Sequence, residues 1–255
     1  MSALFSLISP ADLAAAFGIA LLAGTVKGLV GFAMPMIFIS GLSMFLAPDL
    51  ALAGLILPTL VTNGIQALRQ GPQAALASIG KFRVFLLIGL MCLLLSAQSV
   101  RVLPQQALLL VIGVPVTVFA FIQLMGKTFS IANPTRRSEA VVGGIAGLIG
   151  GVSGVWGPPT VAYLTALGTE KTEQIRVQGV IYGLGAVALL LAHVGSGVMR
   201  AETAPFSLAL IVPAVAGMWI GGQLHDRIDQ VLFRRATLFV LLIAGLNLLR
   251  RGLLM

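Results

Sequence analysis

Long apolar stretches, separated by short polar or turn-forming segments, run along the whole chain. Eight such blocks are visible, at residues 12–47, 50–68, 82–99, 104–126, 139–168, 177–199, 205–222 and 231–249. Several are about 20 residues long, which is enough for an α-helix to cross the hydrocarbon core of a bilayer. The blocks are continuous runs of Leu, Ala, Val and Ile, whereas a transmembrane barrel shows short segments of alternating polarity. The pattern therefore predicts an all-α, polytopic helical membrane protein.

Glycines recur at matching places in the two halves of the chain. A shift of 126 residues pairs Gly18 with Gly144, Gly24 with Gly150, Gly28 with Gly154, Gly31 with Gly157, Gly71 with Gly197 and Gly126 with Gly252. Such self-similarity indicates a duplicated unit. We divide the chain into a first transmembrane repeat (1–126), a cytoplasmic connecting loop (127–138) and a second transmembrane repeat (139–255).

The distribution of lysine and arginine indicates how the repeats are oriented, because short cytoplasmic loops carry an excess of these residues. If every block crosses once from a cytoplasmic N-terminus, nine loop Lys and Arg lie inside and six outside. If the long blocks 12–47 and 139–168 each return to the side they entered, and the C-terminus lies on the outer side, eleven lie inside and four outside. The second arrangement predicts two inverted repeats, each a broken helical hairpin plus three transmembrane helices, with the C-terminus on the outer side. Single kinked spans for the two long blocks remain the alternative.

Each long block contains small residues at a helical spacing, followed by proline. The glycines lie at i, i+4 and i+7: Gly24, Gly28, Gly31, then Gly150, Gly154, Gly157. Small residues on one face let another helix approach closely. The prolines are Pro35, Pro158 and Pro159. Because proline disrupts the helical hydrogen-bond ladder, we predict two short helices meeting at an unwound joint. The helix after the joint presents free N–H groups that suit an anion. Packing alone is the competing interpretation of the glycines.

Several segments together resemble the TauE/SafE family of sulfite exporters, small bacterial anion transporters. They are GTVKGLVGFAMP at 24–35, GLIGGVSGVWGPP at 147–159, NGIQALRQG at 63–71, GGQLHDRI at 221–228 and NLLRRG at 247–252. The resemblance covers nearly the whole chain. It implies a multi-pass protein of the bacterial inner (cytoplasmic) membrane that moves sulfite, sulfonates such as sulfoacetate, or related anions. The family commonly shows three glycines after the first break, where this chain has GFAMP at 31–35.

One charged residue, Lys27, lies deep inside an apolar block. The chain is 58% hydrophobic and 9% charged, and all eight carboxylates lie at block ends or in loops. Cation transporters and proton relays usually place a carboxylate in the membrane, so the substrate is expected to be anionic or neutral. Lys27 lies within the first break, where a buried charge is costly and usually functional. We interpret Lys27 as attracting an anion; snorkelling to a membrane surface is the alternative.

The candidate substrate-binding residues come from the breaks and from the blocks that follow them. They are Lys27, Gly28, Gly31, Thr62, Asn63, Gln66, Ser153, Gly154, Trp156, Gly157, Gln178 and Tyr182. Asn63 and Gln66 are three apart and share a helical face, from which both can donate to sulfonate-type oxygens. Hydrogen bonding between helices is the alternative for these amides. Trp156 is interpreted as a cavity wall or gate, or else as an interfacial anchor.

Some features of the chain also fit classes of function other than a transporter. The GxSG sequence around Ser153, with His193 as a base, is the pattern of an intramembrane serine protease. Position 153 is equivalent to Lys27 in the repeat, so we expect a duplicated scaffold and no enzyme. A transporter or channel for another solute remains open, as does a membrane scaffold. Two distant histidines and one cysteine predict no metal site, and we expect no cofactor.

The expected mechanism is alternating access. The two breaks converge near the membrane midplane, helix N-termini and Lys27 hold the anion, and one half rocks against the other. Export is expected, because an anion leaving a cell with a negative interior moves down the electrical gradient. The expected partners are a small anionic substrate and membrane lipid, not nucleic acid, and a homodimer is left open.

Overall fold

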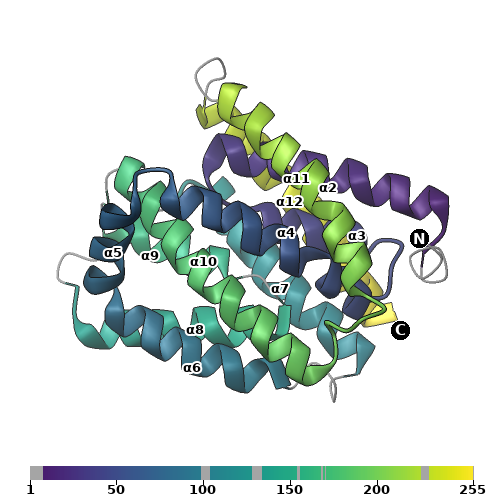
Figure 1. Cartoon of the computed structure of the whole chain (residues 1–255), viewed down its shortest axis with the longest axis horizontal. Coiled ribbons are helices and arrows are strands. Elements are labelled where there is room, and N and C mark those ends of the chain that lie inside the picture. Colours follow the sequence, from purple (N-terminus) through teal and green to yellow (C-terminus); the bar gives the residue numbers. More distant parts are fainter. Residues whose placement is uncertain are drawn as a thin grey trace.

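The computed structural model describes residues 8–98, 104–127, 134–153, 156–167, 169, 171–224 and 230–254. Its regular elements are α-helices, and no strand occurs in these residues (Figure 1). The helices are α2 (Pro10–Val30), α3 (Met34–Leu42), α4 (Pro48–Leu68), α5 (Pro72–Lys81), α6 (Arg83–Ala97), α7 (Gln105–Leu124), α8 (Arg136–Ser153), α9 (Gly157–Ala166), α10 (Lys171–Ser196), α11 (Ala204–Leu224) and α12 (Gln230–Leu254).

Four of the described helices are long and apolar enough to cross a bilayer: α2, α4, α10 and α11. The pair α5 and α6 makes a fifth span only if the two are counted as one helix bent by 81°. The prediction of an all-α protein with several membrane spans is therefore confirmed. Three further spans in each half and the inverted relation of the two halves stay a finer prediction.

The first long block divides unevenly, into α2 with 21 residues and α3 with 9. Gly31 ends α2 in the left-handed region, at φ 79°, and its N–H donates to the carbonyl oxygen of Lys27. Ala33 precedes α3 at φ 75°, a conformation that costs an L-residue about 1–2 kcal/mol. Near the end of α3, Gly41 lies against the side chain of Ile19 in α2. The short helix α3 therefore folds back along α2, and the block is a hairpin.

The joint of this hairpin lies after the glycine cluster, not within it. Gly24 and Gly28 are inside α2, and only Gly31 belongs to the joint. Pro35 occupies the second position of α3, where the absent N–H has no intrahelical partner to lose. The proline thus starts the second helix, and the left-handed residues before it provide the turn.

The second long block has a similar course. The helix α8 ends at Ser153, and α9 begins at Gly157, with Pro158 and Pro159 in its first turn; Gly154 lies outside the described residues. Tyr163 of α9 stacks on Phe85, with ring centroids 6.1 Å apart. Gly143, in the first half of α8, lies against the backbone of the same Phe85. Consequently α9 also returns along its preceding helix.

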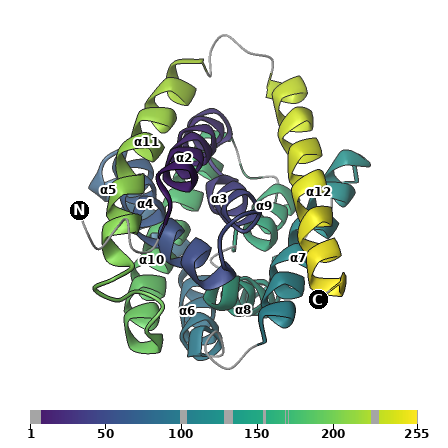
Figure 2. The ribbon, with the colours of Figure 1, turned by 90° about the vertical axis from the view of Figure 1, so that its right-hand side faces the viewer.

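Glycines bring helices of the two halves into backbone contact. A Cβ at Gly24 of α2 would overlap the carbonyl oxygen of Ala214 in α11, and one at Gly217 would overlap that of Leu21. In the same way a Cβ at Gly147 of α8 would overlap the carbonyl oxygen of Gly89 in α6. Figure 2 shows α2 beside α11, α6 beside α8 and α7 beside α12. The first helix of each half thus packs on a helix of the other half.

Helices related by the 126-residue shift pack antiparallel. In α4 and α10, Gln66 lies beside Ile175 and Gly179, whereas the earlier residue Asn63 lies beside the later residue Gly183. In α7 and α12, Gly113 contacts Leu248 and Leu249, whereas Gly252 contacts Leu109 and Leu110. The two helices of each pair therefore run in opposite directions.

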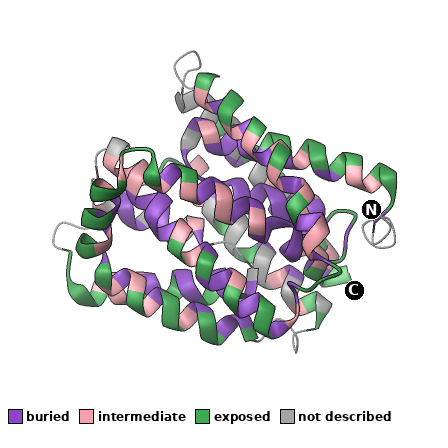
Figure 3. Cartoon of the chain, in the orientation of Figure 1, coloured by how far each residue is buried: buried purple, intermediate pink, exposed green. Residues whose placement is uncertain are grey.

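Burial follows the same arrangement. The short helix α3 and most of α4 are buried, while the outer faces of α2, α6 and α11 are exposed (Figure 3). The exposed side chains on these faces are apolar, for example Leu95, Val212 and Trp219. Apolar outer faces fit contact with lipid tails.

The glycine contact between α2 and α11 leads to a stability prediction. Gly24→Ala is expected to lower the free energy of unfolding by about 1–3 kcal/mol, because the new methyl group forces the two backbones apart. Gly18→Ala is the matched control in the same helix, since a Cβ there has nothing within 4 Å. It is expected to stabilise by up to about 1 kcal/mol through helix propensity. Thermal unfolding in detergent measures both, and equal effects would contradict the close contact.

Candidate functional site

Lys27 lies in the last turn of α2, just before the joint at Gly31. It is 1% exposed, and its Nζ donates to Oδ1 of Asn63 in α4. No carboxylate of a described residue comes within 4.0 Å of this ammonium group. A buried positive charge whose one partner is a neutral amide is poorly compensated.

Gln66 connects the first joint to two other helices. Its Nε2 donates to the carbonyl oxygen of Gly31 at 2.9 Å and to that of Ile175 in α10 at 2.9 Å. Both hydrogen atoms of this amide are therefore used by backbone carbonyls. Gln66 satisfies the end of α2 and holds α4 and α10 beside it.

Polar atoms without partners surround this joint. Asn63 Nδ2, Gln66 Oε1, Gln178 Oε1 and Thr59 Oγ1 are buried and have no hydrogen-bond partner among the described residues. A Cβ built on Gly31 would lie 3.4 Å from Oε1 of Gln178, which places that amide at the joint. Because most buried polar atoms in proteins are satisfied, such a concentration indicates a place that binds a polar ligand.

The second joint lies against the next turn of α10. The hydroxyl of Tyr182 donates to the carbonyl oxygen of Gly157 at 3.4 Å. Trp156 is 4% exposed and packs on Gly150 and Gly185, with its ring 6.4 Å from that of Tyr182. Since residues four apart share a helical face, Gln178 and Tyr182 connect the two joints through one face of α10.

Some predicted binding residues lie outside this cluster or have other partners. Gly28 lies against the backbone of α11, at Met218, Gly221 and Gly222, and this contact accounts for a glycine by itself. The hydroxyl of Thr62 donates to the carbonyl oxygen of Pro58 at 2.7 Å. Gly154 and the side chain of Ser153 are not among the described groups. A binding role for these residues stays a prediction.

His193 is fully buried in α10, with both ring nitrogens in contact with other groups. Nε2 lies 2.9 Å from the carbonyl oxygen of Gly151, and Nδ1 lies 3.0 Å from Oγ of Ser196. These contacts fasten the end of α10 to the end of α8. The described residues contain no group of three or more His, Cys, Asp or Glu side chains that could hold a metal ion.

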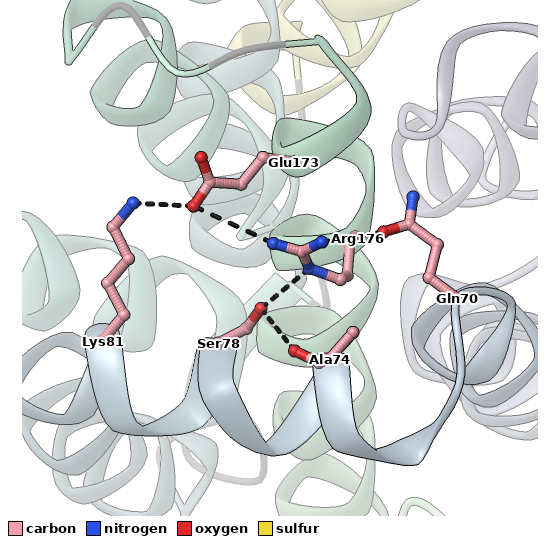
Figure 4. A network of polar contacts seen from close by, with 6 residues as sticks. All are labelled: Gln70, Ala74, Ser78, Lys81, Glu173 and Arg176. Carbon is pink, nitrogen blue, oxygen red and sulfur yellow. Dashed lines mark hydrogen bonds and ion pairs between the residues drawn. The ribbon is translucent and has the colours of Figure 1, made fainter.

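A network of charged and polar side chains joins α5 to the start of α10 (Figure 4). Arg176 donates from Nε to Oγ of Ser78 at 3.1 Å and from Nη1 to Oε1 of Gln70 at 2.9 Å. Glu173 accepts from Lys81 at 2.6 Å and lies 3.9 Å from Arg176. The sequence analysis missed this network because residues 69–81 lie between two apolar blocks and no helix was predicted there. Its signal was Ser78 and Lys81, three apart and so on one helical face.

The network adjoins the cluster at the first joint. Arg176 directly follows Ile175, whose carbonyl oxygen is bonded by Gln66. One end of α10 thus carries both the partner of the joint and the polar contacts to α5.

Comparison with known proteins identifies one family. A family model described as sulfite exporter TauE/SafE matches residues 16–248 of the 255. No curated protein and no solved structure matches the chain.

The pair of Lys27 and Asn63 leads to a second stability prediction. Asn63→Leu is expected to destabilise by about 1.5–3 kcal/mol, because it removes the described partner of a buried ammonium group. The double variant Lys27→Met, Asn63→Leu is expected to equal or exceed the stability of the wild type, since apolar replacement of both buried partners removes the desolvation cost. Thermal unfolding without added anions measures both. If the double variant were as unstable as Asn63→Leu alone, the Lys27–Asn63 pair would be a stabilising part of the fold.

Proposed function

The chain belongs to the TauE/SafE family of sulfite exporters, and from this premise we propose that it exports sulfite and small sulfonates such as sulfoacetate across the bacterial cytoplasmic membrane by alternating access. The family is one of membrane transporters of sulfur-containing anions, which agrees with a protein that is not an enzyme. The observation that carries the proposal is the buried Lys27 beside unpartnered amides.

The chemistry of the first joint suits an oxyanion. The Lys27 ammonium supplies a full positive charge, and the free Nδ2 of Asn63 supplies a neutral donor from the neighbouring helix. An anion between them would compensate the charge that no described carboxylate compensates. The unpartnered Oε1 atoms of Gln66 and Gln178 are acceptors, which suit the hydroxyl of a protonated sulfite.

Two inverted halves are supported by the packing of equivalent helices. The antiparallel contacts of α4 with α10 and of α7 with α12 are those expected if an approximate two-fold axis across the helices relates the halves. The pairs α2 with α11 and α8 with α6 follow the same relation, because α2 corresponds to α8 and α11 to α6. Inverted repeats with broken helices at their interface are typical of secondary transporters.

The electrical gradient supports export. A negative cell interior favours the outward movement of an anion by about 2.3 kcal/mol per charge at 100 mV. All eight carboxylates lie at the ends of apolar blocks or between them, so no acidic side chain is offered mid-membrane for a coupled cation.

Transport in proteoliposomes tests the proposed function. Radiolabelled sulfite is expected to enter vesicles in response to a positive-inside potential, and sulfoacetate is expected to compete. Lys27→Met is expected to reduce this flux at least about tenfold, because the loss of a charge-assisted contact of about 1.5–3 kcal/mol weakens anion binding by that order.

Two matched variants sharpen this experiment. Lys127→Met removes an exposed lysine and is expected to keep the flux, whereas Ser153→Ala distinguishes an anion carrier from a serine protease. No sulfite or sulfonate flux in the wild type would reject the substrate class. Loss of function with Ser153→Ala and not with Lys27→Met would support a serine nucleophile and contradict the anion carrier.

The α5–α10 network is proposed to close the first joint from the cytoplasmic side. In a Cys92→Ser background, Ile175→Cys provides a thiol beside the joint, and an impermeant thiol reagent applied from that side measures access. Arg176→Leu is expected to raise the labelling rate about twofold to fivefold, since partly exposed ion pairs are worth up to about 1 kcal/mol. Arg69→Leu is the control, an exposed arginine outside the network. Equal rates in all three proteins would exclude a closing role.

A further inference from the structure

A cavity of about 470 Å³ lies between α6, α8 and α10, with Trp156 in its wall. Nearly all of its wall is apolar, and Leu87 and Leu191 at its margin are 61% and 65% exposed. The cavity therefore opens toward the apolar outer face of the molecule, where lipid tails would lie.

Small residues create this space. Gly143 and Gly147 of α8 lie in the wall, and their contact with the α6 backbone keeps those two helices tightly packed. On α10, the small residues Gly185 and Ala188 lie in the opposite wall, between larger apolar residues such as Leu184 and Leu191. Since the glycine contacts keep α6 against α8, the space beside Gly185 and Ala188 stays open as a cavity.

The length of the cavity matches one lipid leaflet. Its wall runs from Arg83 to Leu93 along α6 and from Ile181 to Leu191 along α10. Ten residues of α-helix span about 15 Å. The hydrocarbon core of a bilayer is about 30 Å thick, so one leaflet contributes about 15 Å.

A cationic group marks one end of the cavity. Arg83 lies in the wall at the start of α6, is exposed, and has no ion pair with a described carboxylate. The nearby acidic groups have other partners: Glu139 accepts from the N–H of Phe85 at 3.0 Å, and Glu173 pairs with Lys81. The guanidinium of Arg83 is thus available to a phosphate, which it can bind with two parallel hydrogen bonds.

We propose that this cavity binds one acyl chain of an anionic phospholipid, with the phosphate of its headgroup on Arg83. The chain would run between α6 and α10 and end against Trp156, whose ring forms part of the inner wall. This site does not depend on the identity of the transported anion. It places lipid in contact with the second joint, beside Gly157 and Tyr182.

Tryptophan fluorescence tests this site directly. The chain has two tryptophans, and Trp219 is 67% exposed on α11, so Trp219→Phe leaves Trp156 as the only reporter. The variant is reconstituted into phosphatidylcholine vesicles with increasing amounts of phosphatidylglycerol whose acyl chains carry bromine, a contact quencher. Brominated phosphatidylcholine is titrated in parallel.

Trp156 is expected to be quenched by both lipids, with an apparent affinity about fivefold higher for the anionic one, the size of effect that one arginine has at an anionic surface. Adding Arg83→Gln is expected to abolish this preference, and adding Arg69→Gln, at another exposed arginine, is expected to keep it. Quenching confined to a Trp156→Phe protein that retains Trp219 would place lipid on the outer surface only. That result, equal quenching by the two lipids, or a preference that survives Arg83→Gln would overturn the proposal.

Discussion

A helix that ends inside an apolar surrounding leaves backbone carbonyls that must find donors, and this requirement governs the centre of the molecule. At the first joint the donor is one side-chain amide, Gln66, which serves the carbonyls of Gly31 and Ile175 together. The joint, α4 and α10 are thereby fixed relative to one another. Lys27, one turn before the joint, and Asn63, one turn before Gln66, meet because of this arrangement. The polar cluster is thus a consequence of how the backbone carbonyls at the broken helix find their hydrogen-bond donors.

The two halves share a layout but not a chemistry. Under the 126-residue shift, Lys27 corresponds to Ser153, while Asn63 and Gln66 correspond to Leu189 and Ala192. The first half therefore supplies the charge and the amide that holds its joint. The second half contributes Gln178 and Tyr182 from one face of α10. The polar cluster thus lies nearer to one joint than to the other, so an anion bound there would affect the two halves unequally.

The sequence predicted the helical class, the division of the two long blocks and the residues around the first joint, because each left a local signal. Lys27 stands alone among apolar residues, and Asn63 and Gln66 share a helical face. Other features had no such signal. The positive φ of Ala33 is imposed by the turn, and an alanine in the sequence does not indicate it. The carbonyl of Ile175 is a backbone group that any residue could supply. Glycines such as Gly24 and Gly31 look alike in the sequence, yet one is a packing contact and the other a helix end.

The exchange of partners between the halves has a consequence for biosynthesis. Although α2 leaves the ribosome well before α11, its glycine face packs on α11, which begins at Ala204. At typical translation rates of about 5–20 residues per second, the intervening chain takes on the order of 10–35 s to make. During that interval Lys27 has no completed interior around it. The nascent protein therefore has to keep a charged helix in or near the bilayer for many seconds. Because the contacts of the finished fold do not yet exist, the membrane insertion machinery has to stabilise this helix.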